Sequence, residues 1–318
     1  LGAGAMGSVW LSHHIGLDIP VAIKILKPSL IEETPEYVKR FIQEGKLAGQ
    51  INHPNITRIF DAGNVDNTYY LVMEYVKGCD LLELIETRGR FPTEEVLNLG
   101  ITLSNALHEA HTHNVIHRDI KPDNIMIAED GSIKLSDLGM AKSIGDNFSS
   151  TMMGSAMGSP NYISPEQVRN AKMADARSDV YSLGATLYHV AAGVVPFQGG
   201  SAMDVMLRHC NDKVVAPKEI VPEISTELSQ IICKMLEKKP NKRFQNCAQV
   251  AEALSKLKYP KTKSQKKSFS YKKVEKGKCK KGKRYKKKGQ SPQMVPNLRF
   301  CTLKCLALSS RLTNQYLK

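Results

Sequence analysis

The hydrophobic pattern of this chain changes its period near Gly78, and that change limits the folds that the chain can adopt. Before Gly78, short β-branched runs such as 21–26 alternate with turn residues, with one helical stretch near 35–51. After it, apolar residues recur at helical spacing, most clearly at 93–112 and 178–193. Further helices are predicted near 201–211, 225–237 and 246–257. The pattern therefore predicts an α+β fold, with a small sheet and one helix followed by a larger, mainly helical part.

Two short strand-like segments, 125–127 and 133–135, lie near the junction of the two parts. Asp130-Gly131 stands between them, and such a pair is typical of a tight β-turn. We therefore predict a hairpin at the junction, which is also a natural position for a ligand cleft between two lobes.

The net charge of +14 is concentrated after residue 255. Residues 1–255 carry 24 Lys and Arg against 30 Asp and Glu, whereas residues 256–288 carry 17 Lys and Arg against the single Glu275. A segment of that composition buries too little apolar surface to fold alone. We expect the folded part to end near residue 257 and a basic, disordered extension to occupy 258–318.

The basic extension has two interpretations. Aromatic residues interleave with its charges at Phe269, Tyr271 and Tyr285, and this mixture fits contact with a polyanion, nucleic acid or anionic lipid, through residues 258–290. A solvated linker fits equally well. A protein that acts mainly by binding nucleic acid through this extension is therefore an alternative function.

Cysteine usage and hydropathy exclude several other classes. The seven cysteines are scattered and lack the Cys-x-x-Cys spacing of structural zinc sites, which argues against a disulfide framework as well. No apolar run of about 18 residues and no leader is visible, so we expect no transmembrane segment and a cytoplasmic location. Four histidines, at 108, 111, 113 and 117, lack an accompanying acidic or cysteine ligand set, and we interpret them as structural.

A glycine-rich run, Gly2-x-Gly4-x-x-Gly7, opens the chain between strand-like residues. Glycine lets the backbone approach phosphates closely, but dinucleotide-binding folds and ordinary turns contain such runs too. Lys24 follows within an apolar strand, and although a lone strand lysine is usually an edge residue, the combination favours a phosphate-binding loop. The chain starts without methionine inside this strand, so we expect a fragment whose first strand is truncated.

The most specific feature is the run His117-Arg118-Asp119-Ile120-Lys121-Pro122-Asp123-Asn124. Asp137-Leu138-Gly139 begins 13 positions beyond Asn124, after an apolar strand. Two carboxylates and an amide at strand ends form a hard oxygen ligand set that suits Mg²⁺ with bound phosphates.

On these motifs the chain resembles the eukaryotic-like, or Hanks-type, serine/threonine protein kinase family over residues 1–257. The run 163–167, Ile-Ser-Pro-Glu-Gln, is most similar to the bacterial members. The resemblance implies a two-lobed protein kinase fold, with a β-rich N-lobe over 1–76 and a helical C-lobe over 77–257. It implies transfer of the ATP γ-phosphoryl group to serine or threonine hydroxyls of protein substrates, with Mg²⁺ bound.

The resemblance also assigns roles that are general to protein kinases. Asp119 would accept or orient the proton of the substrate hydroxyl, and Lys121 would neutralise charge on the transferring phosphoryl group. Asn124 and Asp137 would hold magnesium ions. Lys24 would contact the α- and β-phosphates. A scaffold that binds nucleotide without turnover is disfavoured, because these groups are all present.

An acidic partner for Lys24 is expected on the helix near 35–51. Glu44 matches the family position better than Glu36 does, and its alternative role is that of a solvated acid on the helix face.

The resemblance implies that adenine lies between apolar side chains, with Met73 at the back of the pocket. The backbone of Glu74 and Val76 would form hydrogen bonds with the edge of the adenine ring. Asp80 would contact the ribose, or it would cap the following helix. The complete expected ATP site consists of Leu1, Gly2, Gly4, Gly7, Val9, Ala22, Lys24, Glu44, Met73, Glu74, Val76, Asp80 and Met126.

The segment from Asp137 to Glu166 resembles an activation segment and is rich in hydroxyls. Because Arg118 stands beside Asp119, we hypothesise a phosphate-accepting pocket, with phosphorylation at Thr151 or Ser155 raising activity. A loop that is Ser-rich for solubility is the other interpretation. The resemblance further implies a buried ion pair between Glu166 and Arg243, and an anchoring role for Asp179 beneath the catalytic loop.

Overall fold

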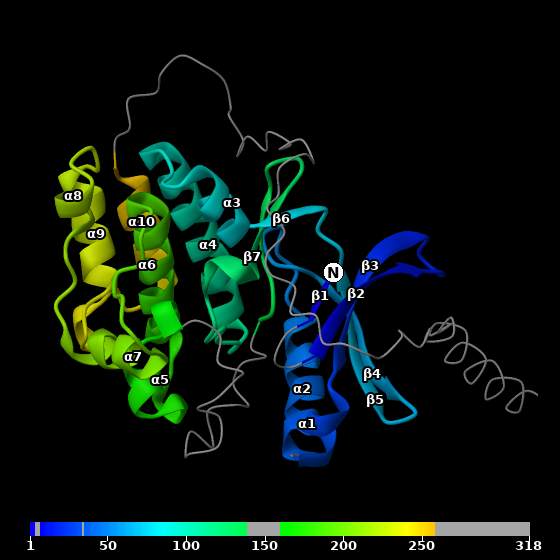
Figure 1. Ribbon diagram of the computed structural model, residues 1–318. Helices are drawn as coiled ribbons and strands as arrows, with labels where there is room; N and C mark the ends of the chain where they lie inside the picture. The colour runs from blue at the N-terminus through cyan, green and yellow to red at the C-terminus, as the bar shows by residue number, and fades with distance from the viewer. Residues whose placement is uncertain (4–6, 34, 139–159, 258–318) are drawn as a thin grey trace, which may run out of the picture. The chain divides into compact units, whose positions relative to one another are not determined.

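The computed structural model describes residues 1–3, 7–33, 35–138 and 160–257 (Figure 1). These residues divide into a large unit, 1–11 with 22–257, and a small unit, 12–21. Gly4, both predicted phosphorylation sites, Thr151 and Ser155, and the basic extension lie outside the described residues. The proposed contact of that extension with polyanions stays a prediction.

A five-stranded sheet forms the first part of the chain. Its strands lie in the order β1-β2-β3-β5-β4. Asp66 and Asn67 connect β4 to β5 with positive φ angles of 47° and 59°, the conformation that a two-residue hairpin turn requires. The strands are β1 (Gly2–Ala3), β2 (Gly7–His14), β3 (Ile19–Leu26), β4 (Ile59–Val65) and β5 (Thr68–Glu74).

Two helices accompany this sheet, where the sequence pattern predicted one. The predicted helix is α2 (Pro35–Ala48), which packs against β4 and β5. The second is the short α1 (Pro28–Glu33), and the expectation of a single helix was wrong. Six residues are too few to display a helical period, and Pro28 was the readable signal, because proline is favoured at the first helical position. A small apolar cluster of Ala22, Leu26, Phe41, Leu71 and Met73 forms the core here.

The helical part is organised around α6 (Ala176–Ala192), whose residues are buried nearly all round. It packs against α4 (Thr93–Thr112), and α10 (Cys247–Ser255) lies against both (Figure 1). The remaining helices are α3 (Leu81–Arg88), α5 (Pro165–Arg169), α7 (Ala202–Asn211), α8 (Pro217–Ile220) and α9 (Thr226–Met235). None of the helices in the described ranges combines the length and apolar character needed to span a bilayer.

A second, three-stranded sheet confirms the predicted hairpin. Its strands are β6 (Gly78–Asp80), β7 (Ile125–Ala128) and β8 (Ile133–Leu135), in that order. Gly131 has a φ of +82° in the turn between β7 and β8. The side-chain amide of Asn55 donates to the carbonyl of Ile133 at 2.8 Å. Leu135, the last residue of β8, precedes Asp137 by only two positions. The hairpin therefore positions the backbone that carries the Asp137 carboxylate.

The small unit, residues 12–21, contains the ends of β2 and β3 and the turn between them. The amide of Asp18 donates to the carbonyl of His14 at 2.8 Å, and His13 contacts the Asp18 carboxylate at 2.7 Å. Ile15 and Leu17 are exposed in this turn.

Candidate functional site

Asp179 anchors the loop 117–124 from within the core. It lies in the first turn of α6 and is fully buried. Its carboxylate accepts hydrogen bonds from the backbone amides of His117 at 2.9 Å and Arg118 at 2.8 Å, and contacts the His111 imidazole at 2.7 Å. A buried carboxylate is costly unless its lone pairs are occupied, and these contacts satisfy it. The anchoring role expected of Asp179 is confirmed, and His111 is a partner that we did not anticipate.

His117 joins this loop to the residues before Asp137. Its Nδ1 accepts from the backbone amide of Asp119 at 3.3 Å, and its Nε2 lies 2.9 Å from the carbonyl of Ser136. Both contacts fit the tautomer that carries its proton on Nε2. The two segments that carry the expected catalytic and metal-binding carboxylates are therefore joined through one buried ring.

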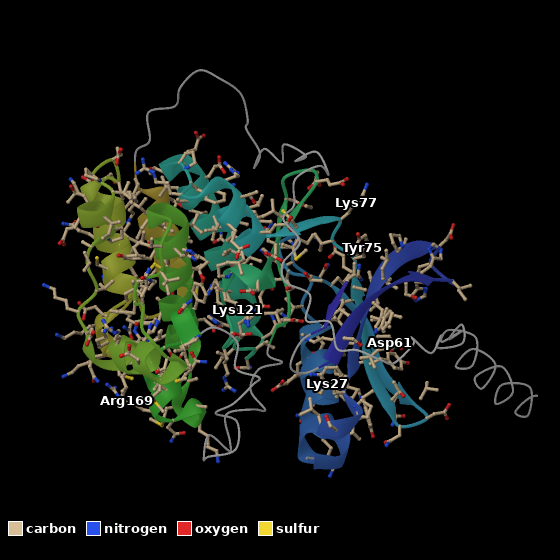
Figure 2. The ribbon with its side chains drawn as sticks, viewed as in Figure 1. Lys27, Asp61, Tyr75, Lys77, Lys121 and Arg169 are labelled. Atoms are coloured by element: carbon tan, nitrogen blue, oxygen red, sulfur yellow. The ribbon has the colours of Figure 1, made fainter. Side chains whose placement is uncertain are left out.

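Asp119, Lys121 and Asn124 meet as expected (Lys121 is labelled in Figure 2). The Asp119 Oδ2 accepts from Lys121 Nζ at 2.8 Å and from Asn124 Nδ2 at 3.0 Å. The Asn124 amide also donates to the Asp119 carbonyl at 2.7 Å. Pro122–Asn124 form a 3₁₀ turn that folds the chain back, which is why residues five positions apart touch. The other oxygen of the Asp119 carboxylate accepts no hydrogen bond from the described residues.

Lys24 pairs with Asp137. The two charged groups are 2.9 Å apart, and the lysine side chain is 9% exposed whereas that of Asp137 is 33% exposed. Burial alone would raise the pKa of the Asp137 carboxyl, but the Lys24 ammonium, with His117 and Lys121 nearby, holds that pKa below its usual range. Asp137 has a φ of +61°, a backbone conformation that costs a residue other than glycine about 1–3 kcal/mol. Its carboxylate is thus kept ionised and fixed in direction.

The residues expected to bind magnesium fit that ion by the chemistry of their donor atoms. Asn124 is buried and uses its Nδ2 as a donor to Asp119, which leaves its amide oxygen as an acceptor. Asp137 supplies an ionised carboxylate. Mg²⁺ usually takes one or two protein oxygens of this kind and completes its shell with phosphate and water. Asn124 and Asp137 are therefore suitable ligands.

Glu44, the expected partner of Lys24, lies on α2 and is half-buried. Lys24 contacts Asp137 directly. The pairing of Lys24 with Glu44 stays a prediction.

The glycines of the first strands have different surroundings. A Cβ on Gly7 would stand 1.9 Å from the carbonyl oxygen of Ile25, so the approach of β2 to β3 requires glycine there. A Cβ on Gly2 would meet no atom of the described residues within 4 Å. Packing therefore explains Gly7, whereas the open space beside Gly2 is consistent with its expected role at a ligand.

Three of the five apolar residues expected around adenine lie together. Ala22 and Met73 are buried in the small cluster of the sheet, and Val9 packs against it. Leu1 is 66% exposed, with its amino group donating to the Val9 carbonyl at 2.9 Å. Met126 is half-buried on β7, opposite Asp80 of β6. The structure does not bring Leu1 and Met126 into this cluster.

Glu74, Val76 and Asp80, which were expected to contact the nucleotide, differ in their hydrogen bonds. The Glu74 amide donates to the Arg58 carbonyl at 2.8 Å, and the Glu74 side chain contacts Lys134 at 2.6 Å. Val76 has no backbone hydrogen bond within the described residues, so its peptide groups are available to a ligand. Asp80 caps α3, accepting from the Glu83 amide at 2.8 Å. The capping alternative for Asp80 is confirmed, and its contact with ribose stays a prediction.

The short helix α5 is fixed to the core by a buried ion pair. Arg243 donates to both carboxylate oxygens of Glu166, at 2.7 and 2.8 Å, and Ser178 donates to Glu166 at 2.7 Å. Burial would raise the pKa of Glu166, but the bonds from Arg243 and Ser178 outweigh it and lower that pKa. The expected pair is confirmed. Sequence reasoning gave no role to Gln167, the next residue, although the spacing Ser164-x-x-Gln167 is a readable helix-capping signal.

Comparisons with known proteins agree with this geometry. Residues 1–259 match the protein kinase domain family. A probable serine/threonine-protein kinase of Clostridium perfringens is 38% identical over 258 residues, covering 81% of this chain and 37% of that protein. Serine/threonine-protein kinase PknB of Mycobacterium leprae is 37% identical over 254 residues (79% and 40%), and PrkC of Bacillus subtilis is 38% identical over 245 residues (77% and 37%).

A solved structure of Rad53 residues 1–466 in complex with AMP-PNP has the same fold, with a TM-score of 0.65 and 24% identity, covering 80% of this chain and 62% of that one. The chain spans between 37% and 40% of the length of the three curated relatives.

Proposed function

The chain belongs to the protein kinase domain family, and on that premise we propose that it transfers the γ-phosphoryl group of ATP to serine or threonine hydroxyls of protein substrates. The observation that carries the proposal is the grouping of Asp119, Lys121 and Asn124 on a loop held by the fully buried Asp179. Catalysis of this kind depends mainly on positioning and electrostatics, and a rigid loop supplies both.

Asp119 is the group that receives the proton in this proposal. Its other carboxylate oxygen accepts no hydrogen bond within the described part of the chain and is available to the substrate hydroxyl, while Oδ2 is held by Lys121 and Asn124. The hydroxyl oxygen forms a bond to the γ-phosphorus, and the bond from that phosphorus to the bridging oxygen of ADP breaks. The proton of the hydroxyl passes to Asp119. Lys121, 2.8 Å from Asp119, offsets negative charge where it accumulates.

In this proposal Lys24, Asn124 and Asp137 bind the phosphates of ATP and their magnesium ion. Lys24 supplies an ammonium group to its phosphates, and Asn124 with Asp137 would hold Mg²⁺, which supplies neutralisation of phosphate charge when bound. The apolar group of Val9, Ala22 and Met73 offers a surface for adenine.

Incubation of the purified chain with Mg²⁺ and radiolabelled ATP tests this function, alongside Asp137→Asn and, as a matched control, Asp130→Asn. Asp130 is exposed in the β7–β8 turn, and asparagine retains the oxygen that accepts the Ser132 amide. We expect label on the chain itself and on a generic basic protein, lost in Asp137→Asn and kept in Asp130→Asn. Binding of ATP by the wild type without any transfer would instead support a nucleotide-binding scaffold.

We propose further that phosphorylation of Thr151 or Ser155 raises activity. The support is the hydroxyl-rich sequence and the position of Arg118 beside Asp119. Mass spectrometry of fully active protein without phosphate between 138 and 160 would contradict this. The cytoplasmic location expected from the sequence also stays a prediction.

A further inference from the structure

Gln167 connects the end of the expected activation segment to the catalytic loop. It lies on α5, whose last residue, Arg169, is labelled in Figure 2. Its side-chain oxygen accepts from the Ser164 amide at 3.2 Å and from the Ser164 hydroxyl at 2.8 Å. Its Nε2 donates to the carbonyl of Arg118 at 2.7 Å. One amide group therefore caps α5 and, at the same time, holds the residue before Asp119.

The peptide group between Arg118 and Asp119 is held at both ends. Gln167 binds its carbonyl oxygen at 2.7 Å, and the His117 ring accepts from its N–H at 3.3 Å. Arg118 has a φ of +66°, and its own amide donates to the buried Asp179 at 2.8 Å. Such a conformation costs about 1–3 kcal/mol and persists only where the surroundings enforce it. Gln167 and Asp179 hold the carbonyl and the amide of Arg118 from two different helices.

We propose that Gln167 is a positioning residue for Asp119, and that through it the segment 164–169 holds the catalytic loop in its active geometry. This inference rests on the proposed phosphoryl transfer. An amide is the neutral side chain of this length that can accept from Ser164 and donate to Arg118 together. A glutamate at residue 167 would present an acceptor to the Arg118 carbonyl, and a methionine would present no strong partner to either group.

Gln167 is not the sole attachment of α5. The adjacent Glu166 fixes the helix through two bonds from Arg243 and one from Ser178. A change at 167 is therefore expected to free the Arg118–Asp119 peptide while α5 stays in place. Ser164→Ala removes only the bond from the Ser164 hydroxyl, and it leaves both the bond from the Ser164 amide and the bond to Arg118.

The test compares kcat and KM of the wild type with Gln167→Glu, Gln167→Met and Ser164→Ala on one peptide substrate. The matched control is Gln249→Glu. Gln249 lies in the first turn of α10 and is exposed, and among the described residues its side chain accepts only from the Gln245 amide. We expect both Gln167 variants to lose about 10- to 100-fold in kcat, with KM for ATP within about twofold. Ser164→Ala and Gln249→Glu should each change kcat by less than about threefold.

Activity as a function of pH adds a signature that a purely structural role would not produce. A protonated glutamate can donate to the Arg118 carbonyl as glutamine does, so the activity of Gln167→Glu relative to wild type should rise as pH falls from about 8 towards about 5. The titratable and charged groups on the loop and packed against it are the same in both proteins, so the ratio isolates residue 167. They include His111, His117, Arg118, Asp119, Lys121, Asp123, Glu166, Asp179 and Arg243. Gln167→Met should show no such rise.

The outcomes separate the two proposals. A wild type that binds ATP without transferring phosphate would end the proposed function. A wild type that is active, with Gln167→Glu equal to Gln249→Glu, would end the positioning role. Thermal unfolding of each variant completes the test. If the loss of kcat in the Gln167 variants is explained by their unfolded fraction, Gln167 serves only the helix cap. An equal loss of kcat in Ser164→Ala would lead to the same conclusion.

Discussion

The catalytic loop and the glycine-containing sheet are held in different ways. The loop 117–124 is bonded to a fully buried carboxylate, Asp179, beneath which lies the large core of the helical part. The sheet has a small apolar cluster, and its β2 strand exposes Trp10 (55%) and Leu11 (53%). Elements with few buried contacts open at lower free energy than core elements do. The groups proposed to act in phosphoryl transfer are thus on a firmly held loop, whereas those expected to bind the nucleotide are on a sheet with a smaller core.

Removing the proposed proton acceptor from the catalytic loop should have the largest effect. We expect Asp119→Asn to lower kcat by about 10²–10⁴-fold, because an amide cannot take the proton of the substrate hydroxyl. The affinity for ATP should stay unchanged, as measured by titration with a fluorescent nucleotide. Asp130→Asn is again the control, and equal turnover in the two variants would contradict the assignment.

Breaking the buried pair beneath α5 should cost stability rather than chemistry. Arg243 is 3% exposed, and Arg243→Met would leave Glu166 with one hydroxyl partner. Removing one member of such a pair costs about 3–5 kcal/mol. At about 2–4 °C per kcal/mol, Tm should fall by roughly 6–20 °C in differential scanning fluorimetry.

The matched control for Arg243→Met is Arg208→Met. Arg208 forms exposed pairs with Asp204 at 3.4 Å and Asp212 at 3.7 Å, and surface pairs contribute about 0–1 kcal/mol. Equal shifts of Tm in the two variants would show that the buried pair contributes no more to stability than the exposed pairs do.

The same ion pair predicts a dependence on pH. The pKa of Glu166 is lowered in the folded protein from its ordinary value of 4.5. Its contribution to the free energy of unfolding is therefore complete above pH 4.5 and is lost as pH falls through the lower folded pKa. The stability difference between wild type and Arg243→Met should consequently shrink below that pH. Urea titrations above and below pH 4.5 measure this difference in the free energy of unfolding. A difference that is the same at both pH values would contradict the role given to the charge of Glu166.

On the sheet, Lys24→Met should lower kcat/KM by about 10²-fold, because a cation at the phosphates is lost. Stability should change by less than about 1 kcal/mol, since Asp137 is partly exposed and water can replace the ammonium. The pKa of Asp137 should rise without its cation, so the acid limb of the pH–rate profile should move to higher pH. An unmoved limb would show that the pair does not govern ionisation of Asp137.

The smallest effects are expected for two glycines of the glycine-rich run, Gly7 and Gly2. Gly7→Ala would place a Cβ 1.9 Å from the Ile25 carbonyl and should destabilise the sheet by about 1–3 kcal/mol. Gly2→Ala meets open space and should leave Tm unchanged while weakening ATP binding. A Tm that falls equally in both would mean that neither glycine serves the ligand.

Much of the fold was readable from the chain, because local rules produced it. The period change at Gly78, the Asp130-Gly131 turn and helices such as 93–112 all appear where the pattern predicted them. The run 117–124 also predicted that Asp119, Lys121 and Asn124 act together, since they lie within one short turn. The extra helix α1 was missed because six residues show no period.

The amino-acid sequence by itself determined which chemical groups this protein has and, over short distances, which of them meet. Tertiary structure alone decided the contacts between residues far apart in the chain. His111 contacts Asp179 across 68 positions, and Gln167 donates to Arg118 across 49. Lys24 meets Asp137 although more than a hundred residues separate them. Such pairs follow no period or capping rule, because they exist only once packing of the core has brought their elements together.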